Sequence, residues 1–400
     1  MFDAIVVGAR CAGSPTAMLL ARKGYRVLLV DGARFPSDTI STHFIWPPGV
    51  ACLQRWGLLD RVVATNCPVV RRIGLDLGDF TLTGELPPID GTADCYAPRR
   101  TVLDKLLLDA AAAAGVEIRE GFAVTGLIET GGRVAGIRGR GRDGAEISEA
   151  ARLVVGADGY NSIVARTVRA EEYNVTPVLT CVFYGYWRDV PAHLPAIHPR
   201  ERRTIISYPT NDGLTMTIVV APREEFEAVR ADPDRYMQDG IAMVADWAEP
   251  FRDRGYVEEL RGTAAIPNFF RKPYGDGWAL VGDAGYHKDP ILAQGISDAF
   301  RSVEWLVAAI DDGFSGRRPL AEALADYQRR RDDHCKPMYD LCMDLAALKP
   351  PPPEMIDLFR ALRSNQAECD RYFGTLAGTV PIPDFYAKEN VDRIIASASA

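Results

Sequence analysis

Long hydrophobic runs and metal-binding patterns are both missing from this sequence of 400 residues. No stretch of about 18 uninterrupted apolar residues occurs, so no transmembrane helix is predicted. The sequence opens with MFDAIVVGA, without a basic segment ahead of an apolar one, and no secretory signal is expected. None of the eight cysteines forms a C-x-x-C pair, and none of the five histidines has H-x-x-x-H spacing. We therefore expect reduced thiols, a cytoplasmic location and no metal site.

An excess of positive charge is missing as well. Lys and Arg number 46 against 54 Asp and Glu, which gives a formal net charge of −8 and a pI of about 5.3. This balance argues against a protein that binds nucleic acid or an anionic membrane surface. Hydrophobic residues make up 47% and charged residues 25%, an ordinary globular composition, and the length corresponds to roughly two to three domains.

The first motif lies near the start of the chain. Residues 3–8 and 26–31 have the pattern of buried strands, and a helical pattern lies between them, which predicts a β-α-β unit with parallel strands. The turn after the first strand reads Gly8-Ala-Arg-Cys-Ala-Gly13. In such a unit the helix N-terminus binds a pyrophosphate. An acid at the end of the second strand, here Asp31, accepts hydrogen bonds from ribose hydroxyls.

Arg10 occupies the position of the second glycine in this fingerprint. Its side chain is expected either to neutralise a pyrophosphate or to be solvated. For this motif by itself, an ordinary strand-to-helix turn in an unrelated α/β protein is the alternative. We predict cofactor-binding roles for Gly8, Arg10, Ala12, Gly13 and Asp31.

Two later segments repeat the succession of a buried strand, a Gly/Asp turn and the start of a helix. One contains Asp158-Gly159, and the other contains Gly282-Asp283 followed by Pro290. Each could be a structural turn when taken alone. The three motifs in this order and spacing argue against three unrelated turns.

With these motifs the sequence resembles, over roughly residues 1–345, the FAD-dependent monooxygenases of the para-hydroxybenzoate hydroxylase type. These enzymes are related to geranylgeranyl reductases and flavin-dependent halogenases. The resemblance implies that the first motif binds the ADP half of FAD. It also implies that Gly282-Asp283 holds the ribityl chain and that Asp158-Gly159 serves both FAD and NAD(P)H.

The resemblance implies further FAD contacts. Arg100, in an Arg-x-x-Leu context, matches an arginine that touches FAD, and Val124 matches a position whose backbone meets the adenine. Gly295-Ile296 lies at the start of a helix predicted over 293–312. The dipole of that helix would stabilise negative charge on the pyrimidine edge of reduced flavin.

The patterns together predict an α/β fold. It consists of a Rossmann-like FAD-binding domain, an inserted antiparallel β-sheet domain for the substrate, and a C-terminal helical segment. β-Branched and aromatic runs between residues 175 and 221 indicate the antiparallel sheet. The expected boundaries are 1–66, 98–170 and 276–345 for the FAD-binding domain, 67–97 and 171–275 for the substrate domain, and 346–400 for one helix (354–373) with an extended tail.

The resemblance also implies a reaction. NADPH or NADH reduces FAD, O2 adds to give a flavin hydroperoxide, and a hydrophobic small molecule, aromatic ones included, is hydroxylated or epoxidised. The alternatives are an FAD-dependent reductase of the geranylgeranyl-reductase type and a non-catalytic FAD-binding module. A halogenase is disfavoured because the segment from Trp187 lacks the second Trp and the Ile of Trp-x-Trp-x-Ile-Pro. A homodimer and a separate flavin reductase as electron donor are left open.

His43 and Pro290 are the predicted catalytic residues. His43 follows the second strand in a loop expected near the isoalloxazine, where it could deprotonate a phenol or relay a proton. Hydrogen bonding in a packed loop is the alternative for this histidine. Pro290 matches the proline of the family's Pro-x-Gly-Gly-Gln-Gly pattern. Leu292 and Ala293 replace the glycine pair of that pattern, which argues against large movements of the flavin.

Four aromatic residues are predicted to line the substrate site: Trp46, Tyr184, Tyr186 and Tyr208. Trp46 follows the loop of His43, and the three tyrosines lie on the predicted antiparallel strands. Alternate residues of such strands line one face of the sheet, and in this fold that face covers the active site. Packing in the sheet core is the alternative for each of them.

Overall fold

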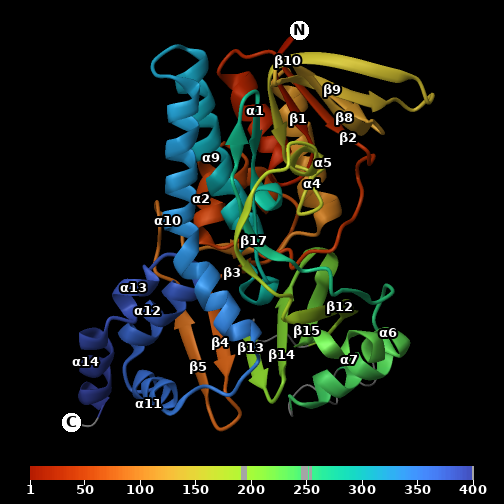
Figure 1. The fold of residues 1–400 in the computed structure, drawn as a ribbon. Coiled ribbons are helices and arrows are strands. Elements are labelled where there is room, and N and C mark those ends of the chain that lie inside the picture. The colour runs from red at the N-terminus through yellow and green to blue at the C-terminus, as the bar shows by residue number, and fades with distance from the viewer. Residues whose placement is uncertain (191–195, 245–250, 252–254, 399–400) are drawn as a thin grey trace.

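A computed structural model describes residues 1–190, 196–244, 251 and 255–398 (Figure 1). Its upper half is built on a sheet of eight strands in the order β18-β19-β10-β1-β2-β7, with β8 and β9 joined to it through β10. β1 pairs in parallel with β2 and β10, and β10 pairs in parallel with β19. The strands are β1 (Phe2–Val7), β2 (Val27–Asp31), β7 (Glu117–Glu120), β8 (Ala123–Thr130), β9 (Arg133–Arg140), β10 (Glu146–Gly156), β18 (Tyr274–Gly275) and β19 (Trp278–Leu280).

The central strand β1 is buried on both faces, which explains its uninterrupted apolar run. Ala4 and Val6 pack in one cluster with side chains of four long helices, and Ile5 and Val7 pack in another with α5 and the β8–β9 hairpin. The long helices are α1 (Gly13–Arg22), α4 (Arg100–Ala113), α9 (Gly295–Phe314) and α10 (Leu320–Ala346), and the short one is α5 (Ile163–Thr167).

The lower half is built on a second sheet in the order β16-β12-β15-β14-β13-β4-β5, in which most neighbours are antiparallel (Figure 1). Alternate residues of β12 enter different clusters: Tyr184 and Tyr186 face α10 and the C-terminal helices, whereas Phe183 and Trp187 face α7. The elements are β4 (Arg72–Asp76), β5 (Thr81–Glu85), β12 (Thr180–Arg188), β13 (Ala196–Arg200), β14 (Arg203–Pro209), β15 (Leu214–Pro222), β16 (Arg261–Thr263), α6 (Phe226–Ala231) and α7 (Pro233–Ala242).

The predicted α/β fold with an added antiparallel sheet is therefore confirmed, and the domain boundaries stay a prediction. A third, small sheet has the strand order β11-β17-β20. The remaining elements are α2 (Pro47–Arg55), α3 (Leu59–Val63), β3 (Val69–Val70), β6 (Cys95–Tyr96), β11 (Glu172–Thr176), β17 (Asn268–Arg271) and β20 (Tyr286–His287). No helix in the described part of the chain is both long and apolar enough to cross a bilayer.

The C-terminal segment differs from the prediction of one helix and an extended tail. It forms four helices: α11 (Pro353–Leu362), α12 (Gln366–Ala377), α13 (Ile382–Phe385) and α14 (Lys388–Ala398). The expected helix is interrupted because Asn365 caps α12, its side chain accepting a hydrogen bond from the Glu368 backbone N–H. Gly378 then ends α12 in the left-handed conformation, with φ 72°.

α12 closes one side of the antiparallel sheet. Phe373 on α12 is fully buried and packs on Gly84 of β5, where a Cβ atom would collide with the phenyl ring. The helix can approach the strand only because β5 has a glycine at this position. The phenyl ring of Phe373 in turn covers this part of the strand.

We expect Phe373→Ala to lower the free energy of unfolding by about 3–5 kcal/mol, because it removes a buried ring and leaves a cavity between α12 and β5. Leu345→Ala on α10, where the leucine is 41% exposed, is the control and should cost less than about 1 kcal/mol. Urea unfolding followed by far-ultraviolet circular dichroism measures both. Equal losses in the two variants would contradict the packing described here.

Candidate functional site

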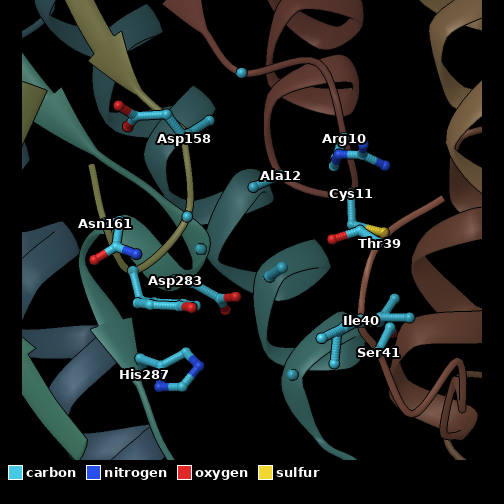
Figure 2. A pocket seen from close by; sticks show the side chains of 18 of the residues that line it. Arg10, Cys11, Ala12, Thr39, Ile40, Ser41, Asp158, Asn161, Asp283 and His287 are labelled. Atoms are coloured by element: carbon cyan, nitrogen blue, oxygen red, sulfur yellow. The ribbon is translucent and has the colours of Figure 1, made fainter. Parts of the chain in front are cut away.

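A cavity of about 720 Å³ lies at the carboxyl ends of β1, β2 and β10 (Figure 2). Ligands of doubly wound sheets bind at this edge, and the volume suits a large cofactor. All three motifs reach the cavity. The predicted cofactor residues that line it are Gly8, Arg10, Ala12, Asp31, Arg100, Val124, Asp158, Gly159, Gly282, Asp283, Gly295 and Ile296.

Close backbone packing at Gly8 holds the first and second motifs together. Gly8 has φ 100°, and a Cβ atom there would collide with the Ala157 carbonyl group at the end of β10. A Cβ atom at Gly13 would collide with the Gly8 carbonyl oxygen. Gly13 therefore acts by letting α1 approach the strand, as the fingerprint predicts, and it lies behind the cavity wall rather than in it.

The Asp31 carboxylate is locked to the turn of the first motif. The Ala9 backbone N–H donates to Oδ2 and the Ala33 N–H to Oδ1, both at 2.7 Å. Val124 lines the same end of the cavity. The residues predicted for the ribose, the pyrophosphate and the adenine thus form one continuous surface.

Two guanidinium groups share one buried carboxylate beside this turn. Arg10 Nη1 lies 2.6 Å from Asp104 Oδ2, and Arg100 lies 3.0 Å from both Asp104 oxygens. Asp104 is fully buried. Two positive charges against one negative charge leave a net positive charge at the wall, which suits a pyrophosphate. Arg10 also bonds to Ser37 Oγ at 2.9 Å, so its half-buried side chain is held by partners within the protein.

Two acids of the later motifs, Asp158 and Asp283, have carboxylate oxygens that are available to a ligand. Figure 2 shows Asp283 pointing into the cavity between the segment of Asp158 and Asn161 and the turn of Arg10. Asp158 Oδ2 accepts from the Ile163 N–H at 2.7 Å, whereas Oδ1 is buried without a hydrogen-bond partner among the described residues. Burial raises the pKa of Asp158. An orphaned buried oxygen of this kind indicates that a ligand or water completes the site.

The far end of the cavity is formed by the segment that leads into α9. Pro290, Gly295 and Ile296 line it there, as predicted. Ala293 has φ 52°, so it adopts the left-handed conformation for which glycine is favoured, and the loop keeps this geometry without the glycine pair. The first N–H groups of α9 have no partners within the helix and carry partial positive charge.

His43 lies just outside the cavity. Thr39, Ile40 and Ser41 line the wall (Figure 2), and the chain then turns through His43, which has φ 61° and is fully buried. His43 Nε2 lies 2.5 Å from Tyr186 Oη, and Nδ1 has no partner among the described residues. Burial lowers the pKa of His43, and the Arg100, Arg99 and Arg261 charges lower it further. The imidazole is therefore neutral at neutral pH.

The structure separates the four predicted substrate aromatics. Tyr184 lines the large cavity. Trp46 and Tyr208 line a second, apolar cavity of about 30 Å³ with Leu292, which is too small for an organic ligand. Tyr186 contacts His43 and lines neither cavity. Trp46 Nε1 donates to the Leu292 carbonyl at 2.9 Å, which ties the small cavity to the loop before α9.

Sequence reasoning missed a set of buried polar groups in the cavity wall. Lys288 pairs with Asp298, and Asp289 accepts a hydrogen bond from Thr180. All four side chains are less than 9% exposed. The only signal of this set in the sequence was the presence of polar residues within the third motif, because their partners are distant in sequence.

These features fit FAD. A net positive charge lies at the pyrophosphate turn, an acid is fixed where the ribose is expected, and Asp283 projects a carboxylate midway along the cavity. A helix N-terminus lies at the far end, where negative charge on the flavin would be stabilised. The buried Asp158 Oδ1, without a partner in the described part of the chain, is open to a hydrogen bond from the cofactor.

Comparisons with known proteins agree with this geometry. The family described as FAD binding domain matches residues 1–341. Digeranylgeranylglycerophospholipid reductase of Methanocella arvoryzae is 27% identical over 319 residues, which cover 75% of this chain and 75% of the relative. The 6-methylpretetramide 4-monooxygenase of Streptomyces rimosus is 27% identical over 342 residues, covering 81% and 78%. The solved structure of the myxobacterial chondrochloren halogenase CndH has a TM-score of 0.80 at 23% identity, covers 99% of this chain and 96% of its own, and is similar in fold.

Asp283→Ala should raise the dissociation constant of FAD about ten- to a hundredfold, because it removes a charged acceptor worth about 1.5–3 kcal/mol. Titration of FAD into the apoprotein, followed by flavin fluorescence, measures the constant. Asp276→Ala is the control, since that side chain is 74% exposed before β19. Unchanged affinity in Asp283→Ala would refute a contact between this carboxylate and the cofactor.

Proposed function

This chain belongs to the FAD binding domain family and is an FAD-dependent oxidoreductase, and from that premise we propose that it is a monooxygenase. In this proposal NADPH or NADH supplies the electrons, and one oxygen atom of O2 is transferred to a hydrophobic small molecule. The products are a hydroxylated or epoxidised compound and water. The oxidation of an aromatic ring is the case that we favour.

The observation that carries the proposal is the meeting of the aromatic sheet face with the cofactor cavity. Tyr184 of β12 and Pro290 before α9 line the same cavity, although they come from different sheets and segments. Phe44, Trp46 and Tyr208 continue this apolar wall beyond the cavity. An apolar wall beside a redox cofactor suits oxygen transfer, since apolar side chains disfavour water near the reacting atoms. The similarity to a relative named 6-methylpretetramide 4-monooxygenase supports this choice.

The residues that would hold FAD follow from the geometry. The turn of Gly8 and the guanidinium groups of Arg10 and Arg100 would take the pyrophosphate, and Asp31 the ribose. Asp283 would take the ribityl hydroxyls. When bound, FAD accepts two electrons from the nicotinamide and passes them to O2. The protein supplies the binding, the orientation and the exclusion of water.

The start of α9 would act on the chemistry directly, and His43 would act from behind the cavity wall. The N-terminus of α9 would stabilise negative charge at the flavin end of the cavity. His43 would accept a proton at Nε2 through the Tyr186 hydroxyl, which lies 2.5 Å away. Its pKa is lowered by burial, so the ring is neutral at neutral pH.

The proposal is tested by anaerobic mixing of the FAD-loaded protein with NADPH, and separately NADH, followed by 18O2. A panel of aromatic and isoprenoid compounds is included one at a time. We expect one compound to speed the loss of the oxidised-flavin absorption band and to gain one 18O atom, detected by mass spectrometry. A parallel sample is reduced photochemically, so that oxygen transfer is also detected if the enzyme takes its electrons from a separate reductase.

Two outcomes would overturn the proposal. A product with two added hydrogens and no 18O identifies a reductase, the activity in the name of the 27% identical relative from Methanocella arvoryzae. No change in any compound, with nucleotide or after photochemical reduction, favours a non-catalytic FAD-binding module.

His43→Ala should slow product formation about a hundredfold or more, because proton transfer by a positioned side chain contributes on the order of 10²–10⁴. The control is His334→Ala on α10, a histidine that pairs with Arg301 away from the cavity wall. Turnover and thermal midpoint are measured for both variants. If the loss of turnover in His43→Ala is no larger than the loss of folded protein that its thermal midpoint implies, the histidine is a packing residue.

A further inference from the structure

Asp289 is a buried acid in the wall of the cofactor cavity for which the proposed reaction has no role so far. It lies between β20 and Pro290, lines the cavity, and is 1% exposed. Its Oδ2 atom accepts from Thr180 Oγ at 2.6 Å, and its Oδ1 atom accepts from the Ile291 N–H at 3.1 Å. The carboxyl group therefore bridges the start of β12 and the loop that leads into α9.

Asp289 differs in its donors from the other acids of known partners that line this cavity. Asp31 accepts from the Ala9 and Ala33 backbone N–H groups, and Asp158 accepts from the Ile163 N–H at the start of α5. Asp289 also has one backbone donor, the Ile291 N–H, but its other oxygen accepts from the Thr180 hydroxyl. Asp298 is paired with the Lys288 ammonium group. Asp289 has no cationic partner among the described residues, so only two neutral hydrogen-bond donors offset the cost of burying its negative charge.

The Thr180 hydroxyl suits a carboxyl group that changes its protonation state. A hydroxyl both donates and accepts, so it donates to Asp289 when the acid is ionised and accepts from it when the acid is protonated. A backbone N–H or an ammonium group lacks this ability. Thr180 is fully buried, so water does not compete for the bond.

We propose that Asp289 is the proton-holding residue of this cavity, an inference that rests on the proposed monooxygenase function. The reaction of a C–H substrate with O2, NAD(P)H and H+ gives C–OH, water and NAD(P)+, so one proton is consumed in each turnover. The Asp289 carboxyl group supplies that proton to the oxygen atom of O2 that leaves as water. The carboxylate then recovers a proton from solvent.

The protonation equilibrium of Asp289 agrees with this role. Burial raises its pKa to about 6, although the Thr180 and Ile291 hydrogen bonds oppose the shift. At pH 7 about a tenth of the molecules then carry the proton. The donor form is present below pH 6 and is lost as the pH rises.

The other titratable groups around Asp289 do not duplicate it. Lys288 beside it is neutralised by Asp298 of α9. His287 Nδ1 donates a hydrogen bond to the Pro267 carbonyl oxygen. On α10, burial raises the pKa of the Cys342 thiol to about 12, so it stays neutral. On β12, burial raises the pKa of Tyr184 to about 12.

Two measurements on the FAD-loaded protein test the proposal between pH 5 and pH 8. In the first, photochemically reduced protein is mixed with O2, and the return of oxidised-flavin absorption is followed by stopped flow. We expect the rate to fall about tenfold for each pH unit above 6. In the second, infrared difference spectra follow the C=O band of a protonated carboxyl group, which should titrate with the same midpoint.

Asp289→Asn should remove the infrared band and flatten the pH profile. Thr180→Val should move both midpoints to higher pH, because the ionised acid loses a hydrogen bond, and Thr180→Ser should leave them unchanged. An Asp289→Asn variant that keeps both the band and the profile would overturn the proposal. So would a Thr180→Val variant with unmoved midpoints, which remains decisive if Asp289→Asn fails to fold.

Failure of this test is distinguishable from failure of the monooxygenase proposal. Neither measurement uses an organic substrate or a nicotinamide. A missing oxygenated product with an Asp289-dependent profile would reject the monooxygenase and retain the proton-holding role. An oxygenated product together with a pH profile that does not depend on Asp289 would retain the monooxygenase and reject the proton-holding role.

Discussion

The close approach of backbone at the carboxyl ends of the parallel strands is the constraint on which the rest of the site depends. Gly8 lies so near the Ala157 carbonyl that no Cβ fits between them, and Gly13 brings α1 against the same turn. At Gly282, whose φ is 62°, a Cβ would lie 2.7 Å from the Ala12 Cβ. Three segments far apart in sequence therefore meet with their backbones nearly touching. The cavity exists because these turns leave the strand ends uncovered while the strands themselves stay buried.

Buried charge is distributed unevenly along the cavity. At the pyrophosphate end, Asp104 is shared by Arg10 and Arg100, and a net positive charge remains. At the flavin end, Lys288 and Asp298 cancel, and Asp289 has only neutral partners. Burying such groups costs free energy that an apolar core would not, so their presence is better explained by ligands than by stability. The gradient matches a cofactor with an anionic middle and a planar, weakly charged ring.

The C-terminal helices extend the structure beyond the part of the chain that matches the family. α12 packs on β5 through Phe373, and Gln294 Nε2 donates to the Leu376 carbonyl at 2.5 Å. Arg301 of α9 donates to the Gly378 carbonyl at 3.1 Å. The loop before α9 is thus held from two sides, by Trp46 and by α12. This support explains how Ala293 keeps a left-handed conformation that costs a residue with a Cβ roughly 1–2 kcal/mol.

The sequence by itself determined the α/β fold, the β-α-β start and the residues of the cofactor cavity. Local patterns suffice for these, because an apolar strand, a glycine turn and a helix start are consecutive in the chain. Asp31 and Asp158 could be identified in the same way, from their positions at strand ends. The helical pattern alone was insufficient in the C-terminal segment, where the cap Asn365 and the left-handed Gly378 bound a separate helix, α12.

Only the tertiary structure decided which side chains face the cavity. A left-handed turn at His43 directs the imidazole to Tyr186 instead, and the four aromatics divide between two cavities and the core. The pairing of Asp289 with Thr180 joins residues 109 positions apart. Side-chain direction and burial of charge depend on contacts between distant segments, and no local pattern encodes them.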